Sequence, residues 1–223
     1  MPATMNGDTP SGTLSLTFDD GPDAGSTPAV LAALAALDAR ATFFMLGERI
    51  ETAPEAARAV VEAGHDLQLH AHRHLRHSDL DECAIEDDTR AALATLAAIG
   101  ARPTRWRTPW GVTTTATKRV AERHGLSLIG WTIDTRDWRG DAASAMLARA
   151  DTQLAPGAVV LMHDALGPGS RRGDVRNTLE LLGPLIAAAR ARGLSVGALP
   201  ALAGVRASEM ATSTELAPSG AGR

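Results

Sequence analysis

The sequence predicts an α/β protein built on a mainly parallel sheet, and three observations support this prediction. Short apolar runs alternate with helical patterns along most of the 223 residues. Strands that alternate with helices are joined by helical crossovers, so they run parallel. Reactive side chains cluster where the predicted strands end, which is where sites form in such sheets. Periodicity alone leaves an open doubly wound sheet and a closed barrel as alternatives.

The first strand and helix set the pattern for the rest of the chain. Residues 14–18 alternate apolar and polar side chains and stop at Asp19-Asp20-Gly21-Pro22, which indicates a strand followed by a turn. Thr27 and Pro28 then supply an N-cap and a first-turn proline for a helix that reaches about residue 38.

Later segments repeat this cycle without a long linker. The further predicted strands cover residues 41–46, 66–70, 105–107, 126–134, 158–163 and 195–199. The further predicted helices cover residues 54–63, 81–99, 115–124, 142–154 and 175–192, and glycines at 64 and 100 close the first two.

Length, charge and cysteine content limit the class of protein. The balance of 22 basic against 26 acidic residues argues against nucleic acid or a membrane as the partner. One cysteine and the lack of a secretory signal favour the cytoplasm, or an extracellular location if the N-terminus is incomplete. We expect a flexible N-terminus over residues 1–11, one domain over residues 12–204 and a disordered tail over residues 205–223. The sequence predicts no oligomeric state.

Histidines are concentrated in one short stretch. Five of the seven lie between residues 65 and 77. His70 and His74 are four residues apart, so both rings can face one ion on a helical turn or in a tight loop. A histidine-rich surface loop is the alternative, because His72 and His77 allow other pairings.

Asp19 and Asp20 are candidates to complete a cation site with these histidines. Adjacent side chains at a strand end point in different directions, so one carboxylate can bind a cation while the other takes a proton from water. A capping turn before Gly21-Pro22 is the alternative interpretation.

Five short motifs follow one another at the predicted strand ends. They are Thr17-Phe-Asp-Asp-Gly-Pro22, His70 with His74, Arg107-Thr-Pro-Trp-Gly111, Asp134 with Asp137 and Trp138, and Leu161 with His163. In this order they resemble the motifs of the polysaccharide deacetylase family, the NodB homology domain of carbohydrate esterase family 4. The resemblance implies a distorted, TIM-like (β/α) barrel of about seven strands over residues 12–204. One departure is Leu69-His70-Ala71, where the family usually has polar neighbours.

The resemblance also implies a metal and a base. Asp20, His70 and His74 would hold a divalent cation, Zn²⁺ or another such as Co²⁺. Asp19 would act as the general base, and Arg107 would orient it.

The remaining motifs imply an acid and an acyl pocket. His163 would be the general acid, and Asp137 would orient it. The backbone N–H of Trp110 would stabilise the oxyanion. Trp138 and Leu161 would enclose the acyl methyl group.

The function implied by the resemblance is metal-dependent hydrolysis of an N-acetyl group from an amino sugar or a related small amide, which releases acetate and a free amine. The aromatic content of 3%, with no Tyr, favours a small substrate because a long glycan groove uses several stacking faces. A deacetylase of polymeric glycan (chitin oligomers or peptidoglycan), a cyclic amide or imide hydrolase, and a non-catalytic glycan-binding barrel are the alternatives.

Residues outside the motifs receive structural interpretations. We expect Trp106 and Trp131 to be core residues and Asp164 to cap the loop after it. Residues 167–173 lack the Lys-Ser/Thr of a phosphate loop, so we expect a mobile rim in which Arg172 is solvated.

Overall fold

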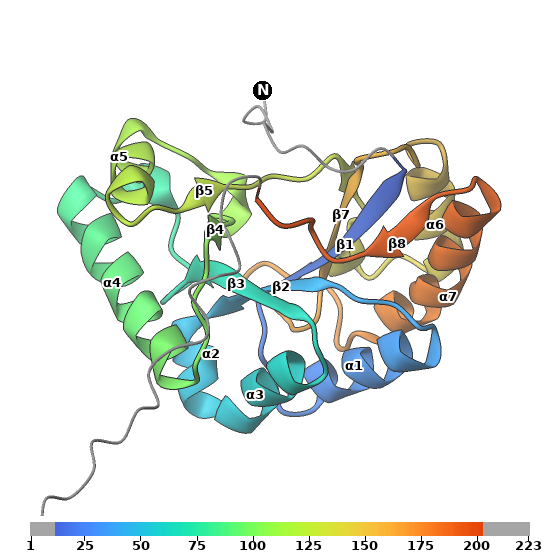
Figure 1. Ribbon diagram of the computed structural model, residues 1–223, viewed down its shortest axis with the longest axis horizontal. Coiled ribbons are helices and arrows are strands. Elements are labelled where there is room, and N and C mark those ends of the chain that lie inside the picture. The colour runs from blue at the N-terminus through green and yellow to red at the C-terminus, as the bar shows by residue number, and fades with distance from the viewer. Residues whose placement is uncertain (1–11, 203–223) are drawn as a thin grey trace, which may run out of the picture.

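The computed structural model describes residues 12–202. The predicted flexible segment over residues 1–11 and the predicted tail over residues 205–223 lie outside this range. Within it, the strands belong to one parallel sheet, and the helices pack around the outside of that sheet (Figure 1). The predicted distorted (β/α) barrel is confirmed.

The sheet has eight strands among the described residues. Seven of them follow the order β5-β4-β3-β2-β1-β7-β6, and β8 pairs with the first residues of β1. The strands are β1 (Thr13–Asp19), β2 (Thr42–Leu46), β3 (Asp66–Ala71), β4 (Arg105–Trp106), β5 (Ser127–Leu128), β6 (Ile133–Asp134), β7 (Val159–His163) and β8 (Ser195–Gly197).

All six predicted helices are present, and one helix is additional. The helices are α1 (Ser26–Ala36), α2 (Gly47–Thr52), α3 (Pro54–Glu62), α4 (Glu82–Ala98), α5 (Thr115–Arg123), α6 (Ala143–Asp151) and α7 (Arg176–Ala191). Helix α2 escaped prediction because six residues carry too little periodicity. Short 3-10 turns are η1 (His77–Asp79), η2 (Pro109–Gly111) and η3 (Asp137–Arg139).

The single strand predicted over residues 126–134 is wrong. This stretch forms β5 and β6, which pair with β4 and β7 at opposite ends of the strand order. The backbone N–H groups of Ile129 and Thr132 bond to β4 and β7. The segment that follows β5 therefore crosses from one end of the strand order towards the other (Figure 1). A glycine weakens a strand interior, which is the sequence signal for this break. The chain itself spans the gap that a closed barrel would fill by pairing its edge strands.

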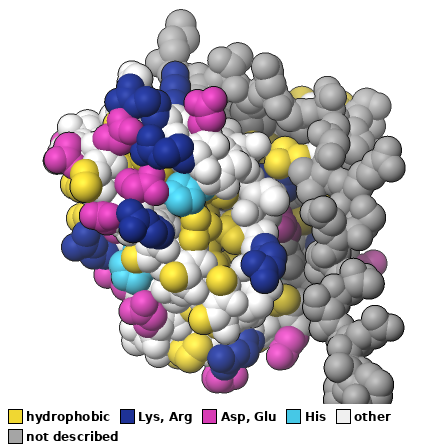
Figure 2. Space-filling model, turned by 60° about the vertical axis from the view of Figure 1, so that its left-hand side comes forward, with side chains coloured by type: hydrophobic (Ala, Val, Ile, Leu, Met, Phe, Trp, Pro, Cys, Tyr) yellow, Lys and Arg dark blue, Asp and Glu magenta, His cyan; other side chains and the backbone are white. Residues whose placement is uncertain are grey.

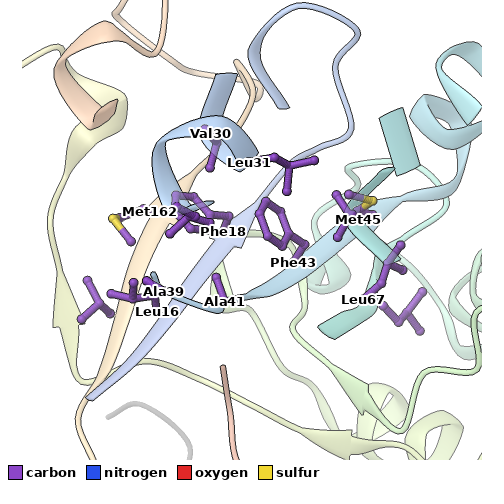
Figure 3. Close-up of a cluster of buried hydrophobic side chains, with 14 of the residues drawn as sticks. Leu16, Phe18, Val30, Leu31, Ala39, Ala41, Phe43, Met45, Leu67 and Met162 are labelled. Atoms are coloured by element: carbon purple, nitrogen blue, oxygen red, sulfur yellow. The ribbon is translucent and has the colours of Figure 1, made fainter. Parts of the chain in front are cut away.

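Strand β1 separates two environments. Leu14, Leu16 and Phe18 are fully buried in the core between sheet and helices, and Figure 3 shows Phe18 close to Val30 of α1 and Met162 of β7. Alternate residues of a strand face opposite sides. The buried polar residues of the other face are Ser15, Thr17 and Asp19. The face of β1 that lines the barrel interior is therefore polar and includes Asp19, while Phe44, Val159 and Leu199 form a small apolar cluster beside it.

The start of α1 differs from the prediction. The helix begins at Ser26, and Asp23 caps it by accepting from the N–H groups of Gly25 and Ser26 at 3.0 and 2.8 Å. Thr27, predicted as the cap, is buried and donates to Asp164 Oδ2 at 2.6 Å. Asp164 therefore links the end of β7 to α1, and the prediction that it caps the following loop is wrong.

The face that carries α4 and α5 mixes both signs of charge (Figure 2). Arg123 of α5 lies 2.8 Å from Glu82 and 3.0 Å from Glu86 of α4. Exposed ion pairs of this kind contribute only about 0–1 kcal/mol each. No helix among residues 12–202 is both long enough and apolar enough to cross a bilayer.

Two neighbouring valines of α3 test the packing of the core. Val60 is fully buried and Val61 is 42% exposed. Val60→Ala should lower the free energy of unfolding by about 2 kcal/mol, because it removes buried methyl groups and leaves a cavity. Val61→Ala is the control, since both changes alter helix propensity equally, and it should change stability little. Urea unfolding of both variants makes the comparison, and equal losses would contradict this packing.

Candidate active site

The register of the sheet brings two motif residues side by side. Asp19 ends β1 and His163 ends β7, and their Cα atoms are partners in the parallel pairing of these strands. The carboxyl ends of neighbouring parallel strands meet at one edge of a sheet. The first and fifth motifs therefore lie on the same site.

Asp20 follows Asp19 in a left-handed backbone conformation, with φ of 75°. Aspartate adopts this region more readily than most residues, so the two neighbouring carboxylates can reach different groups. Asp20 Oδ1 lies 3.3 Å from Nε2 of His70 and 3.2 Å from Nε2 of His74. The ligand atoms of these three residues all lie within 4.8 Å of one another.

These distances suit a bound cation. Two ligand atoms bonded at about 2.0 Å in a tetrahedral site lie about 3.3 Å apart. Asp20 Oδ1 is buried and has no hydrogen-bond partner among the described residues. His70 Nδ1 lies 2.6 Å from the carbonyl oxygen of Arg107, which only accepts, so Nδ1 carries the proton and Nε2 presents a lone pair. One carboxylate and two imidazoles are a donor set that Zn²⁺ favours.

The rim of the site lies directly against this cluster. A Cβ atom on Gly167 would lie 1.8 Å from Asp20 Oδ2, so only glycine fits there. Burial raises the pKa of Asp20, but the imidazoles of His70, His74 and His163 outweigh it and hold the pKa well below its usual value. The Asp20 carboxylate is therefore ionised at neutral pH, as a metal ligand must be.

Arg107 follows β4, is fully buried, and holds Asp19. Its Nη1 donates to Asp19 Oδ1 at 2.8 Å and to Thr17 Oγ1 at 2.7 Å, and its Nη2 donates to the carbonyl of Gly130 at 2.8 Å. Burial lowers the pKa of Arg107, and the charge of Asp19 opposes that shift. The pair is mutually dependent, because either charge buried alone would be strongly destabilising.

Asp137 holds His163 on the opposite flank and is almost fully buried. Its Oδ1 lies 2.7 Å from His163 Nδ1, and its Oδ2 accepts from the backbone N–H of His163 at 2.9 Å. Arg172 Nη1 and Thr178 Oγ1 also donate to Oδ2, each at 2.9 Å. Burial lowers the pKa of His163, but the Asp137 carboxylate outweighs it and raises the pKa to about 9. His163 is therefore protonated at neutral pH.

The site residues surround a cavity of about 280 Å³. Eight of the ten residues predicted from the sequence line it, namely Asp19, Asp20, His70, His74, Trp110, Trp138, Leu161 and His163. Arg107 and Asp137 lie behind the lining and bond directly to Asp19 and His163. Asp134 also lines the cavity, and burial raises its pKa. The fold thus gathers the five motifs around one cavity.

Trp110 forms one wall of this cavity in an unusual conformation. Its φ is 53°, and the residue is 41% exposed. Its ring stands edge-on to His74, with centroids 4.1 Å apart, and the Arg76 guanidinium lies 4.8 Å from its centroid. The hydrogen bonds of the η2 turn are donated by Gly111 and Val112, so the N–H of Trp110 stands outside them.

The two tryptophans predicted as core residues differ. Trp106 is 1% exposed within the core, which confirms its prediction, and its Nε1 donates to the carbonyl of His70 at 2.8 Å. Trp131 packs against the small apolar cluster of Phe44, Val159 and Leu199, but it is partly exposed and also lines the cavity, so its prediction is confirmed only in part. A Cβ on Gly111 would lie 2.6 Å from the Trp131 ring. The segment between β5 and β6, which carries Trp131, therefore lies close against the third motif.

Arg172 is the main site residue that sequence reasoning missed. The prediction of a solvated side chain is wrong, because this side chain is only 4% exposed. Besides Asp137, its guanidinium bonds to the carbonyls of His163 and Ala165 at 2.9 and 3.2 Å. No feature of the sequence distinguishes Arg172 from its exposed neighbour Arg171. The backbone path of residues 167–173 decides which of the two side chains is buried.

A second cavity, of about 790 Å³, shares no lining residue with the site, although Leu166 of its lining lies between Ala165 and Gly167 of the smaller cavity in the chain. Its lining includes the start of α1, parts of α2 and residues 173–176, and none of the ten predicted residues. Arg49 of α2 donates to the carbonyl of Leu166 at 2.6 Å, which ties α2 to the segment after β7.

The ion pair of Asp137 with His163 generates a prediction for the metal-free protein. Asp137→Asn should lower the pKa of His163 below about 9, because the carboxylate that raises it most is gone and only the charges of Asp20 and Asp19 still oppose burial. NMR titration of the imidazole measures the change. Asp141→Asn is the control, because Asp141 pairs with Arg149 elsewhere on the same segment. An unshifted pKa in Asp137→Asn would contradict the assignment.

The same pair makes stability depend on pH in a defined direction. The folded pKa of about 9 exceeds the unfolded value of about 6.5. The contribution of the pair to the free energy of unfolding is therefore complete below about pH 6.5 and is lost as the pH rises through about 9. Asp137→Asn should remove this part of the pH dependence.

Comparison with known proteins gives matches to one family. A sequence profile described as polysaccharide deacetylase matches residues 6–129. A chitooligosaccharide deacetylase from Bradyrhizobium sp. (strain ANU 289) is 34% identical over 204 residues, which are 86% of this chain and 92% of the relative. The peptidoglycan-N-acetylglucosamine deacetylase PgdA from Listeria monocytogenes is 35% identical over 155 residues, which are 68% of this chain and 32% of the relative.

Solved structures share the fold. A family 4 carbohydrate esterase from Streptomyces lividans, in complex with acetate, has a TM-score of 0.76 at 30% identity and covers 83% of this chain and 92% of its own. BA3943 from Bacillus anthracis, described as a pseudoenzyme, has a TM-score of 0.78 at 24% identity over 89% and 68% of the two chains, a likeness of fold alone. The profile, the sequence identity over most of both chains and the barrel agree that this chain belongs to the polysaccharide deacetylase family.

Proposed function

We propose that this protein is a metal-dependent deacetylase that hydrolyses the amide bond of an N-acetylated amino sugar and releases acetate and a free amine. One observation carries the proposal. A carboxylate, Asp19, and a protonated imidazole, His163, line the same small cavity as the cluster of Asp20, His70 and His74. Amide hydrolysis needs an acceptor for the proton of water, a donor for the leaving nitrogen and a positive charge at the carbonyl oxygen.

Asp20, His70 and His74 would hold the cation, and their donor atoms suit Zn²⁺ or a similar ion such as Co²⁺. When bound, such an ion polarises the amide carbonyl and lowers the pKa of water at the site. The tautomer of His70 supports this role, because the carbonyl of Arg107 keeps the proton on Nδ1.

Asp19 acts as the general base in this proposal. The oxygen of water attacks the carbonyl carbon, and one proton of that water passes to the Asp19 carboxylate. Arg107 bonds to Oδ1 at 2.8 Å, so Oδ2 is the oxygen that receives the proton. The buried guanidinium thus fixes the direction from which the proton is taken.

The tetrahedral adduct carries negative charge on the former carbonyl oxygen. The backbone N–H of Trp110 donates to that oxygen in our proposal, because the turn leaves this N–H outside its own hydrogen bonds. Leu161 and Trp138 enclose the methyl group. An apolar pocket of this kind separates acyl groups by only about 1–3 kcal/mol per methylene, so acetyl and slightly longer groups compete.

His163 acts as the general acid. The adduct collapses by breaking its C–N bond, and the departing nitrogen takes the proton of His163 as it becomes a free amine. The pKa of about 9 keeps that proton in place at neutral pH, and Asp137 holds the ring through Nδ1 so that Nε2 is the donor.

The size of the cavity favours a single acetamido sugar as the enclosed group. Its volume of about 280 Å³ lies below the roughly 300–1,000 Å³ of pockets that bury a drug-sized ligand. A polymeric glycan is the second candidate. The exposed ring of Trp110 favours it, since this ring lines the cavity and offers a stacking surface beyond the acetyl pocket. Two relatives are named as deacetylases of chitooligosaccharide and of peptidoglycan.

The proposed compartment is the cytoplasm. Its support is the single cysteine, Cys83, whose thiol is exposed and free, as is usual in a reducing compartment.

The direct test of the function is acetate release. The purified protein supplied with Zn²⁺ or Co²⁺ should release acetate from chitooligosaccharides, and a chelator should abolish the release because the cation is required. Rates on insoluble chitin or peptidoglycan that equal those on oligomers would establish the polymer as substrate. Oligomer binding without any acetate release would contradict the proposal and favour a non-catalytic glycan-binding barrel. Hydrolysis of cyclic imides without release of acetate from oligomers would also contradict the proposal, and it would favour a cyclic amide or imide hydrolase.

The base is tested by Asp19→Asn. This variant should lose about 10²–10⁴-fold in kcat, because the amide cannot accept the proton. Its affinity for Zn²⁺ should stay close to that of the wild type, since Asp19 is not part of the ligand cluster. Asp38→Asn, an exposed carboxylate after α1, is the control. Unchanged turnover in Asp19→Asn would contradict the assignment of the base.

A further inference from the structure

The two histidines of the metal cluster are held in different ways. The ring of His70 is fixed by the carbonyl of Arg107 at 2.6 Å, and its backbone carbonyl accepts from Trp106 Nε1. The ring of His74 lacks such a support, because its Nδ1 is buried without a hydrogen-bond partner among the described residues. The position of His74 therefore depends on the packing of its ring against Trp110 and on its backbone, which follows β3 in a segment without regular structure.

Asp88 of α4 binds the backbone between the two histidines. Its Oδ2 accepts from the N–H of His72 at 2.8 Å, and its Oδ1 accepts from the N–H of Arg73 at 3.1 Å. The Nε of Arg73 adds a contact of 3.3 Å to Oδ1. Each oxygen of the Asp88 carboxylate thus accepts a hydrogen bond from one of two consecutive backbone N–H groups. Such bonds to a charged acceptor are stronger than those to a neutral one.

The helix that carries Asp88 is rigidly placed. Ile85 and Ala92, on the same side of α4, are fully buried in the core, and Asp88 itself is only 7% exposed. From the opposite side, the N–H of Glu48 in α2 donates to the carbonyl of His72 at 3.1 Å. The backbone of His72, two residues before His74, is therefore held at both its N–H and its C=O.

The side chain at the position after His70 offers no alternative support. Ala71 is buried and carries no polar atom, so it cannot bond to the segment that follows. The contacts that orient this segment come from α4 and α2, outside the recognised motifs.

We propose that Asp88 is a positioning residue that sets the affinity of the site for a divalent cation by fixing the backbone that carries His74. This inference rests on the proposed metal site. Residues that orient metal ligands typically change metal affinity by 10–100-fold when they are replaced.

The test compares two adjacent carboxylates of α4. Asp88→Asn places an amide donor against a backbone N–H and should weaken Zn²⁺ binding 10–100-fold in calorimetric titration of the metal-free protein. Asp87→Asn removes the same charge from an exposed neighbour and should bind Zn²⁺ as the wild type does. Asp88→Glu, which keeps the charge but moves it by one methylene, should give a smaller loss and replaces Asp88→Asn if that variant does not fold.

A double-mutant cycle separates positioning from a general loss of structure. In a His74→Ala background, Asp88→Asn should cost no further affinity, because the ligand that it positions is gone. An equal loss in both backgrounds, or Zn²⁺ binding by Asp88→Asn within twofold of Asp87→Asn, would overturn the inference. Failure of the proposed function would give a different result from failure of this inference. The wild type would still bind Zn²⁺, and Asp88→Asn would still weaken that binding, but the wild type would release no acetate.

Discussion

The buried ion pair between Arg107 and Asp19 is the interaction on which the site depends. A guanidinium without solvent contact is stable only when several acceptors surround it. Arg107 finds them on β1, at Thr17 and Asp19, and on the segment that crosses the barrel opening, at Gly130. The Arg107 side chain thus connects β1, at the centre of the sheet, to the segment that crosses the barrel opening. The same guanidinium holds the carboxylate of Asp19, the proposed base.

Arg107 also serves the metal cluster through its backbone. Its carbonyl fixes the tautomer of His70, and Trp106, the residue before it, donates to the carbonyl of His70. The residue after β4 therefore positions a proposed metal ligand with its main chain and the proposed base with its side chain. The same residue thus makes hydrogen bonds to both the proposed base and the proposed metal cluster.

The acid flank is built separately. Asp137 collects donors from His163, Arg172 and Thr178, which belong to β7, the rim and α7. Its negative charge keeps His163 protonated, while Arg172 shares that charge and anchors the rim beside the cavity. The two flanks meet because β1 and β7 are neighbours in the sheet, in a register that pairs Asp19 with His163. A one-residue slip of β7 would turn His163 away from the cavity.

The sequence by itself determined the strand ends and the motif residues. Alternation in residues 14–18 and the turn after Asp19 are local features, and the five motifs identified the ten residues that gather at the cavity. Gly130 is a local signal for a break within residues 126–134, but only the tertiary structure decided that the two halves pair with β4 and β7 at opposite ends of the strand order. It also decided that Arg172 turns inward and that Asp88 binds the segment before His74. Such choices depend on neighbours far away in the chain, and a local pattern of residue types carries no information about them.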